Sequence, residues 1–179
     1  MVAAIVAAAA ITSSPQAVRV PRCATKQLRV HYVSGASVAT LTRVALAYTN
    51  VSSRRCALWG WPRVVATDST GRVRDAIRTG MIPTFQPELR DESQGPGVPA
   101  VVLGRGESAY SFLAAEGVYA SSSRPCPSYV RLTVALPRSA ESVTLSGWVA
   151  GHLNGFIPAC DRPLVSQVLP RSEVRLFGG

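Results

Sequence analysis

The sequence predicts an all-β fold, an antiparallel β-sandwich, and three observations carry this prediction. Short segments with alternating apolar and polar residues recur through most of the chain, Gly, Asn and Pro turn signals separate them, and no long helical pattern interrupts them. The 179 residues suit one domain, and a hydrophobic content of 47% is sufficient for a core. Extensive disorder and a multi-span membrane protein are therefore excluded.

Residues 1–17 have the order of a secretory signal peptide, with an alanine-rich apolar stretch followed by small and polar residues. The apolar run is about half the length that a membrane-spanning helix needs. We expect this segment to direct export and to be removed, which leaves residues 18–179 as a single secreted or cell-envelope domain without a transmembrane span. The alternative is an N-terminal helix of a soluble protein. Arg22 directly before Cys23 disfavours a lipid anchor at that cysteine.

The first two predicted strands each place apolar side chains on one face. In the sequence LRVHYV at 28–33, the shared face holds Leu28, Val30 and Tyr32. In the stretch 41–50, it holds Val44, Leu46 and Tyr48. A Thr-Asn-Val-Ser-Ser turn follows at 49–53, since Asn50 tolerates left-handed backbone and its side chain can bond nearby backbone groups.

The clearest alternation lies at 128–136. It predicts an inward set opposite an outward set, namely Val130, Leu132, Val134 and Leu136 against Tyr129, Arg131 and Thr133. Shorter patterns predict further strands at 62–67, 72–77, 107–114, 142–149 and 164–169. Turn signals at 68–71, 104–106 and 154–155 separate them.

The segment 80–99 departs from this pattern because it carries four prolines and three glycines among acidic residues. It is predicted to be a long loop, and loops above about 12 to 15 residues are either functional or disordered. A surface insertion is the simpler interpretation. A recognition loop is the alternative, including the rigid loop of a protease inhibitor.

Four cysteines form an even set without a C-x-x-C pair: Cys23, Cys56, Cys126 and Cys160. Zinc sites built on thiolates usually bring their ligands in close pairs, so we expect two disulfides and no structural zinc. The nearly equal intervals of 33 and 34 residues favour the local pairs Cys23–Cys56 and Cys126–Cys160.

The rival pair Cys56–Cys126 has the interval of an immunoglobulin domain. That pattern requires a tryptophan well after the first cysteine and a tyrosine two residues before the second. Here Trp59 and Trp61 follow too soon, and Arg124 occupies the tyrosine position. The two local pairs are therefore preferred.

Several of these residues form one ordered pattern. It runs from Cys23 through LAYTN, ending at Asn50, to CALWGWP at 56–62, VVLGRGESAYSFL at 101–113, YVRLTVALP after Cys126 and DRPLVSQVLP after Cys160. This pattern resembles the secreted and envelope domain of actinobacteria known as domain-of-unknown-function family 4232, and its most specific element is the Thr-Asn turn followed by C-x-L-x-G-x-P. The resemblance implies an immunoglobulin-like β-sandwich with two disulfides and names no activity, cofactor or ligand.

Candidate catalytic residues are few. The possible bases are His31, predicted on the solvent face of its strand, and His152, which lies in the turn-like sequence GHLNG. No G-x-S-x-G elbow, glycine-rich phosphate loop or metal-ligand spacing accompanies them. We expect no catalytic site, no metal and no cofactor. A secreted hydrolase or metal-dependent enzyme that uses either histidine is the alternative.

Charge is the strongest remaining signal, because the formal net charge is +9 and Lys26 is the only lysine among 19 basic residues. Arginine binds phosphate and carboxylate with a planar fork, although a GC-rich genome also favours arginine codons. We expect one positive face that contains six arginines, namely Arg54, Arg55, Arg63, Arg72, Arg74 and Arg78. Trp59 or Trp61 would add an aromatic contact if exposed.

The charge and the predicted export together indicate the class of partner. An exported protein rarely meets nucleic acid, so we expect no nucleic-acid partner. Phosphate-bearing glycans, anionic lipid headgroups and acidic protein surfaces fit the charge better. The sequence therefore favours a non-catalytic binding or cell-envelope interaction module.

Overall fold

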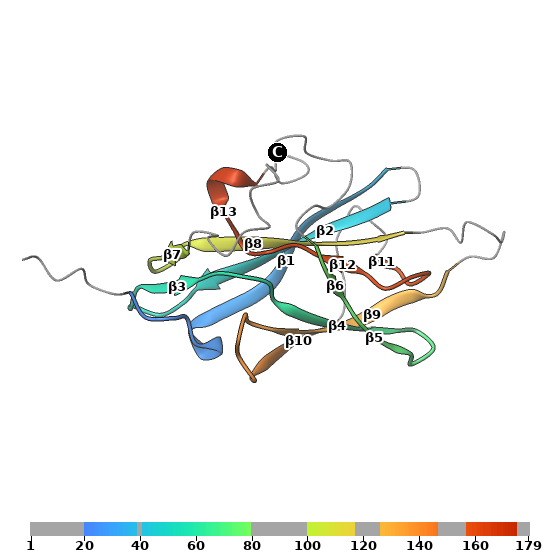
Figure 1. The fold of residues 1–179 in the computed structure, drawn as a ribbon, viewed down its shortest axis with the longest axis horizontal. Helices are drawn as coiled ribbons and strands as arrows, with labels where there is room; N and C mark the ends of the chain where they lie inside the picture. Colours follow the sequence, from blue (N-terminus) through green and yellow to red (C-terminus); the bar gives the residue numbers. More distant parts are fainter. Residues whose placement is uncertain (1–19, 39–40, 80–99, 117–125, 147–156, 175–179) are drawn as a thin grey trace, which may run out of the picture.

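The computed structural model describes residues 20–38, 41–79, 100–116, 126–146 and 157–174, and strands dominate it (Figure 1). The predicted all-β fold is confirmed, and its stacked sheets are compatible with an immunoglobulin-like sandwich. The expected signal peptide at 1–17, the loop at 80–99 and the turn around His152 lie outside the described residues.

The larger sheet has the strand order β1-β2-β8-β12-β6. The strand β13, which follows β12 in the chain, also pairs with β8. Its strands are β1 (Leu28–Val38), β2 (Leu41–Asn50), β6 (Ile77–Arg78), β8 (Ser108–Glu116), β12 (Leu164–Val165) and β13 (Leu169–Pro170). The central pair β2 and β8 is antiparallel and runs in unbroken register from Leu41 opposite Glu116 to Thr49 opposite Ser108. The short β12–β6 pair of this sheet is parallel.

The second sheet has the order β10-β9-β4-β5, with β11 also pairing β9. Its strands are β4 (Arg63–Asp68), β5 (Val73–Asp75), β9 (Ser128–Ala135), β10 (Ser142–Ser146) and β11 (Ile157–Pro158). A separate small sheet pairs β3 (Cys56–Leu58) with β7 (Val101–Leu103), and the 3-10 helices are η1 (Thr25–Gln27) and η3 (Arg171–Glu173). Because β5 and β6 are almost consecutive, the chain crosses from one sheet to the other along one side of the sandwich.

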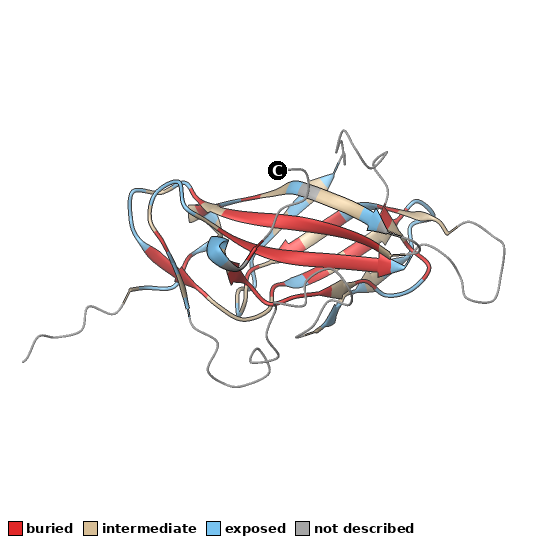
Figure 2. Cartoon of the chain, turned by 90° about the horizontal axis from the view of Figure 1, so that it is seen from above, coloured by how far each residue is buried: buried red, intermediate tan, exposed pale blue. Residues whose placement is uncertain are grey.

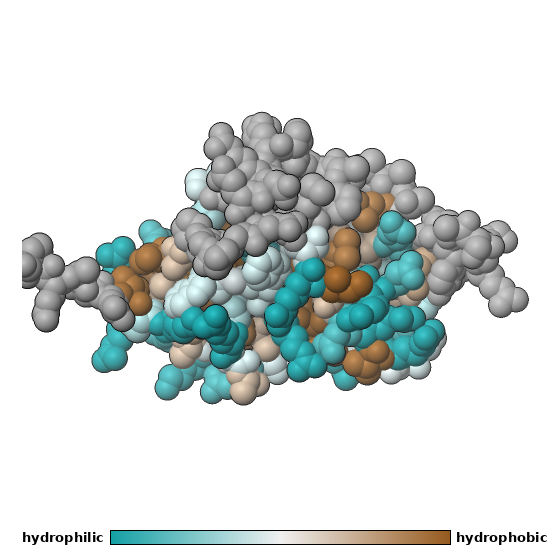
Figure 3. Space-filling view, viewed as in Figure 1, coloured by the Kyte–Doolittle hydropathy of each residue, from teal (hydrophilic) through white to brown (hydrophobic). Residues whose placement is uncertain are grey.

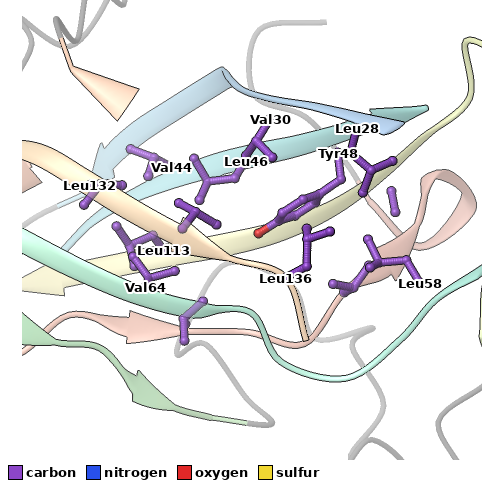
Figure 4. Packing of buried hydrophobic residues seen from close by; sticks show 14 of the residues in the cluster. Leu28, Val30, Val44, Leu46, Tyr48, Leu58, Val64, Leu113, Leu132 and Leu136 are labelled. Atoms are coloured by element: carbon purple, nitrogen blue, oxygen red, sulfur yellow. The ribbon is translucent and has the colours of Figure 1, made fainter. Parts of the chain in front are cut away.

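The main core lies between the two large sheets (Figure 4). The predicted inward residues of the first two strands contribute to it, and all are buried except Tyr32, which is partly buried. From the opposite sheet come Val64 of β4 and Leu132 and Val134 of β9. Alternation with a period of two therefore placed these strands correctly.

A second apolar cluster covers the outer face of β2 and β8, so both strands are buried on two sides (Figure 2). Phe112 is fully buried there, and Leu169 and Val174 near the C-terminus pack over it. The guanidinium carbon of Arg43, itself fully buried, lies 4.0 Å from the centre of the Phe112 ring. Burial lowers the pKa of Arg43 to about 10.

One part of the strand prediction is wrong. Val130 is 43% exposed and Tyr129 is fully buried, the reverse of the expected faces. The cause is a bulge, because Thr67 pairs with Arg131 whereas the next residue, Asp68, pairs with Tyr129. Val130 is the extra residue. One extra residue reverses which of the residues before it point inward and which point outward.

The disulfides are Cys23–Cys56 and Cys126–Cys160, the two local pairs that the spacing favours. The Cα atoms lie 4.8 Å apart in the first and 5.1 Å apart in the second. The first joins the segment before η1 to β3, and the second joins the segment before β9 to the segment after β11. Two disulfides are typical of a domain that folds outside the reducing cytoplasm.

Candidate functional site

The hairpin between β4 and β5 begins at a buried carboxylate. Oδ1 of Asp68 accepts hydrogen bonds from the backbone N–H groups of Thr70 at 2.8 Å and Arg72 at 3.0 Å, and from the Thr70 hydroxyl at 2.6 Å. Gly71 supplies the positive φ of 87° that the turn requires. These contacts fix the direction in which Arg72 leaves the turn.

The same contacts set the ionisation of Asp68. Burial alone would raise the pKa of this carboxyl, but the hydrogen bonds from Thr70 and Arg72, with the Arg72 charge, outweigh burial and hold the pKa below its usual value. A lowered pKa in the folded state means that the carboxylate stabilises the fold above about pH 4, the unfolded value, and that this stability is lost as pH falls through the folded value.

Replacing Asp68 by asparagine keeps an oxygen acceptor and removes the charge. We expect Asp68→Asn to be less stable than the wild type by about 1 kcal/mol near neutral pH, since hydrogen bonds to charged acceptors are the stronger ones. The difference should shrink as pH falls below about 4. Urea unfolding at a series of pH values checks this, and a difference that is constant over the whole range would contradict it.

Five arginines lie on β4, β5, β6 and the adjoining segments, where the chain crosses from one sheet to the other. We call this the edge surface: Arg63, Arg72, Arg74, Arg78 and Arg162. Two of them meet Asp75. Arg63 donates from Nε and Nη2 to the carboxylate oxygens at 3.1 and 3.2 Å, and Arg162 donates from Nε to the backbone carbonyl at 2.9 Å. The edge surface thus includes an exposed ion pair that holds β4 against β5.

Arg74 occupies the most enclosed position on the edge surface. It pairs with Ala66 of β4, and its Nε is buried without a hydrogen-bond partner within the described part of the chain. Its charge is close enough to oppose the rise in the pKa of Tyr129 that burial causes. A buried donor without an acceptor is costly, by about 1 to 3 kcal/mol.

Apolar side chains interleave with these charges. Val73 is 64% exposed and Ile77 is 42% exposed, and both alternate along the chain with arginines of the edge surface. Figure 3 shows apolar patches beside hydrophilic surface over the region of β5 and β6. The edge surface therefore offers both charge and dispersion contacts.

The expected single face of six arginines is divided in the structure. Arg63, Arg72, Arg74 and Arg78 lie on the edge surface, whereas Arg54 and Arg55 lie in the turn between β2 and β3. That turn is at the opposite end of the long axis from the β4–β5 hairpin (Figure 1). These arginines are close in sequence but lie on two surfaces, because the chain runs along the length of the sandwich through β3 and β4.

The two candidate tryptophans are both half-exposed. The guanidinium carbon of Arg22 lies 3.7 Å from the ring centre of Trp59, so one face of that ring already has a partner. Trp61 donates from Nε1 to the carbonyl of Thr79 at 3.0 Å. These contacts tie both rings to neighbouring segments of this chain.

Asn50 is a central residue whose contacts the sequence only partly indicated. Its side chain is buried, donating from Nδ2 to the carbonyls of Arg54 at 2.8 Å and Leu103 at 3.0 Å and accepting at Oδ1 from the backbone N–H and hydroxyl of Ser52. Its backbone carbonyl accepts from Gly106 at 2.7 Å. Asn50 thus clasps the turn after β2 to the turn after β7.

Of the two candidate bases, only His31 lies within the described residues. It is half-buried on β1 opposite Ala47, and no hydrogen bond joins it to a serine or a carboxylate within that part of the chain. The described ranges also contain no group of three residues suited to hold a metal ion. No helix in these ranges is long and apolar enough to span a membrane.

A family model described as "Domain of unknown function (DUF4232)" matches residues 23–162. The match includes both disulfides, the Asn50 clasp and the edge surface. No curated protein and no solved structure gives a significant match. The chain belongs to this family.

Proposed function

We propose that this member of the DUF4232 family is a non-catalytic binding module that holds an anionic component of the cell envelope on its edge surface. The observation that carries the proposal is Arg74, which is half-buried beside the exposed Arg72 and whose enclosed Nε has no acceptor among the described residues. An anionic group bound beside this guanidinium would balance the local positive charge.

The charge balance at the edge surface supports an anionic ligand. Its five arginines stand near three aspartates, Asp68, Asp75 and Asp161, so positive charge remains in excess. Asp75 is engaged by Arg63 in the ion pair, and Arg72 and Arg78 form no ion pair within the described residues. A guanidinium presents a rigid fork of donors that matches phosphate or carboxylate oxygens in a bidentate arrangement.

The chemistry of the surface and the compartment narrow the class of ligand. The disulfides favour a partner outside the cytoplasm, where phosphate-bearing polymers and lipids are the common polyanions, and where a nucleic-acid partner is not expected. We propose phosphate as the recognised group. Val73 and Ile77 would contact the apolar parts of the ligand around it.

Phosphocellulose, a phosphate-bearing polysaccharide, tests this with two variants of equal net charge. The edge variant carries Arg72→Ser, Arg74→Ser and Arg78→Ser. The control removes three exposed charges that lie away from the edge surface, through Lys26→Ser, Arg29→Ser and Arg138→Asn. We expect the edge variant to elute at a clearly lower salt concentration than the control.

The salt concentration at which each variant elutes reports the strength of its charge contacts, because the Debye length falls from about 10 Å at 0.1 M to about 3 Å at 1 M. Equal elution of the two variants would show that only net charge matters and would remove the proposal. Stronger retention on carboxymethyl cellulose than on phosphocellulose would point to an acidic protein surface as the partner and would contradict the choice of phosphate.

A further inference from the structure

A second basic cluster lies at the end of the sandwich opposite the β4–β5 hairpin (Figure 1). We call it the turn surface: Arg54, Arg55 and Arg105, all exposed. None of the three side chains has an ion-pair or hydrogen-bond partner within the described residues. The nearby acid, Glu107, already accepts a hydrogen bond at Oε2 from the backbone N–H of Gly104 at 2.6 Å.

The two turns that make up the turn surface have a fixed relative position. Asn50 reaches the carbonyl of Arg54 in one turn and the N–H of Gly106 in the other, and each hydrogen bond is shorter than 3 Å. The backbone N–H of Asn50 also donates to the carbonyl of Glu107 at 2.9 Å. Arginines that are distant in sequence are therefore held together by backbone hydrogen bonds, and with three arginines beside one glutamate the turn surface keeps a net positive charge.

The separation of the two basic surfaces sets a length scale for a shared ligand. The strands β2 and β8 extend along the molecule between its ends, and strands of nine or ten residues measure roughly 30 Å at about 3.3 Å per residue. A single phosphate group can occupy one surface only. A linear polymer of anionic groups can reach both.

We propose that the ligand of this domain is a linear phosphate-bearing polymer that engages the edge surface and the turn surface together. The inference rests on the proposed function of the edge surface and adds a second contact, which makes binding dependent on polymer length. Once one surface is occupied, the tethered remainder of the chain reaches the other at a high effective concentration, and affinity rises without any new kind of contact.

The experiment compares tripolyphosphate, which cannot bridge roughly 30 Å, with long-chain polyphosphate, which can. Affinities are measured by isothermal titration calorimetry per polymer chain. The turn variant carries Arg54→Ser, Arg55→Ser and Arg105→Ser, and a matched control carries lysine at the same three positions, which keeps the charge. Thermal unfolding confirms that each variant is folded.

We expect the wild type to bind the long chain at least about tenfold more tightly than tripolyphosphate. The turn variant should keep its tripolyphosphate affinity on the edge surface and lose most of the gain with length, whereas the lysine control should retain that gain. A full length-dependent gain in the turn variant, or none in the wild type, would overturn the inference alone. Undiminished tripolyphosphate binding by the edge variant would instead overturn the proposed function.

Discussion

Replacement of Asn50 by alanine is expected to lower the free energy of unfolding by about 3 to 5 kcal/mol. The change removes the partner of the Leu103 carbonyl in a buried site, and of the Arg54 carbonyl and the Ser52 N–H in partly buried ones. Each unsatisfied buried group costs about 1 to 3 kcal/mol. The loss should be large because one side chain serves two turns and the short β3–β7 sheet.

Thr49→Val provides a neighbouring control, because the Thr49 hydroxyl makes one side-chain hydrogen bond, to Ser108 at 2.7 Å. We expect this variant to lose only about 0.5 to 1.5 kcal/mol. Urea unfolding of both variants under oxidising conditions is the measurement. An Asn50→Ala variant that is no less stable than Thr49→Val would show that the clasp contributes little to the fold.

Removal of either disulfide by a pair of cysteine-to-alanine substitutions is expected to cost about 3 to 4 kcal/mol, since each closes a loop of comparable length. Against a typical net stability of about 5 to 15 kcal/mol, loss of both should leave little folded protein at ambient temperature. Chemical denaturation of the three variants measures these effects. Unfolding midpoints that do not change on removal of the bridges would contradict the expected role of the covalent links.

The two bridges differ in their surroundings, which predicts an order. Cys23 and Cys56 belong to the main core, and Cys56 is fully buried, whereas Cys126 is half-exposed. The Cys23→Ala/Cys56→Ala variant therefore loses packing in addition to the covalent constraint, and it should be the less stable of the two single-bridge variants. The reverse order in the same denaturation series would contradict this account of the packing.

The fold class and most strand positions were predictable from the sequence because burial on one face imposes alternation with a period of two. Leu28 and Val30 on β1 and Val44 and Leu46 on β2 follow that rule. Short strands such as β3 and β11 were missed, since two or three residues carry no measurable period.

Other features depend on contacts between distant segments and leave little trace in a local pattern. The bulge at Val130 is visible only from the pairing of β9 with β4. Arg43 is fully buried on a strand whose outer face should meet solvent, because Leu169 and Val174 return from the C-terminal part to cover that face. A period-two pattern indicates one apolar face, but it does not show whether another segment packs over the opposite face.

The candidate site was predicted in part for the same reason. The arginine-rich segment was visible in the sequence, but its division between the edge surface and the turn surface follows from the topology. Arg162 and Arg105 join these surfaces from segments far away in sequence. Only the role of Asn50 as a turn residue was indicated in advance, because asparagine commonly bonds backbone two residues onward, as it does here with Ser52.

The central claim is that this domain binds its anionic ligand at the edge surface, and not wherever its surface is positively charged. Titration with tripolyphosphate, followed by NMR of arginine Nε–Hε groups, tests it most directly. We predict the largest shift at Arg74, with smaller shifts at Arg72 and Arg78 and none at Arg29 or Arg138. Equal shifts at all exposed arginines, with Arg74 unchanged, would contradict the claim.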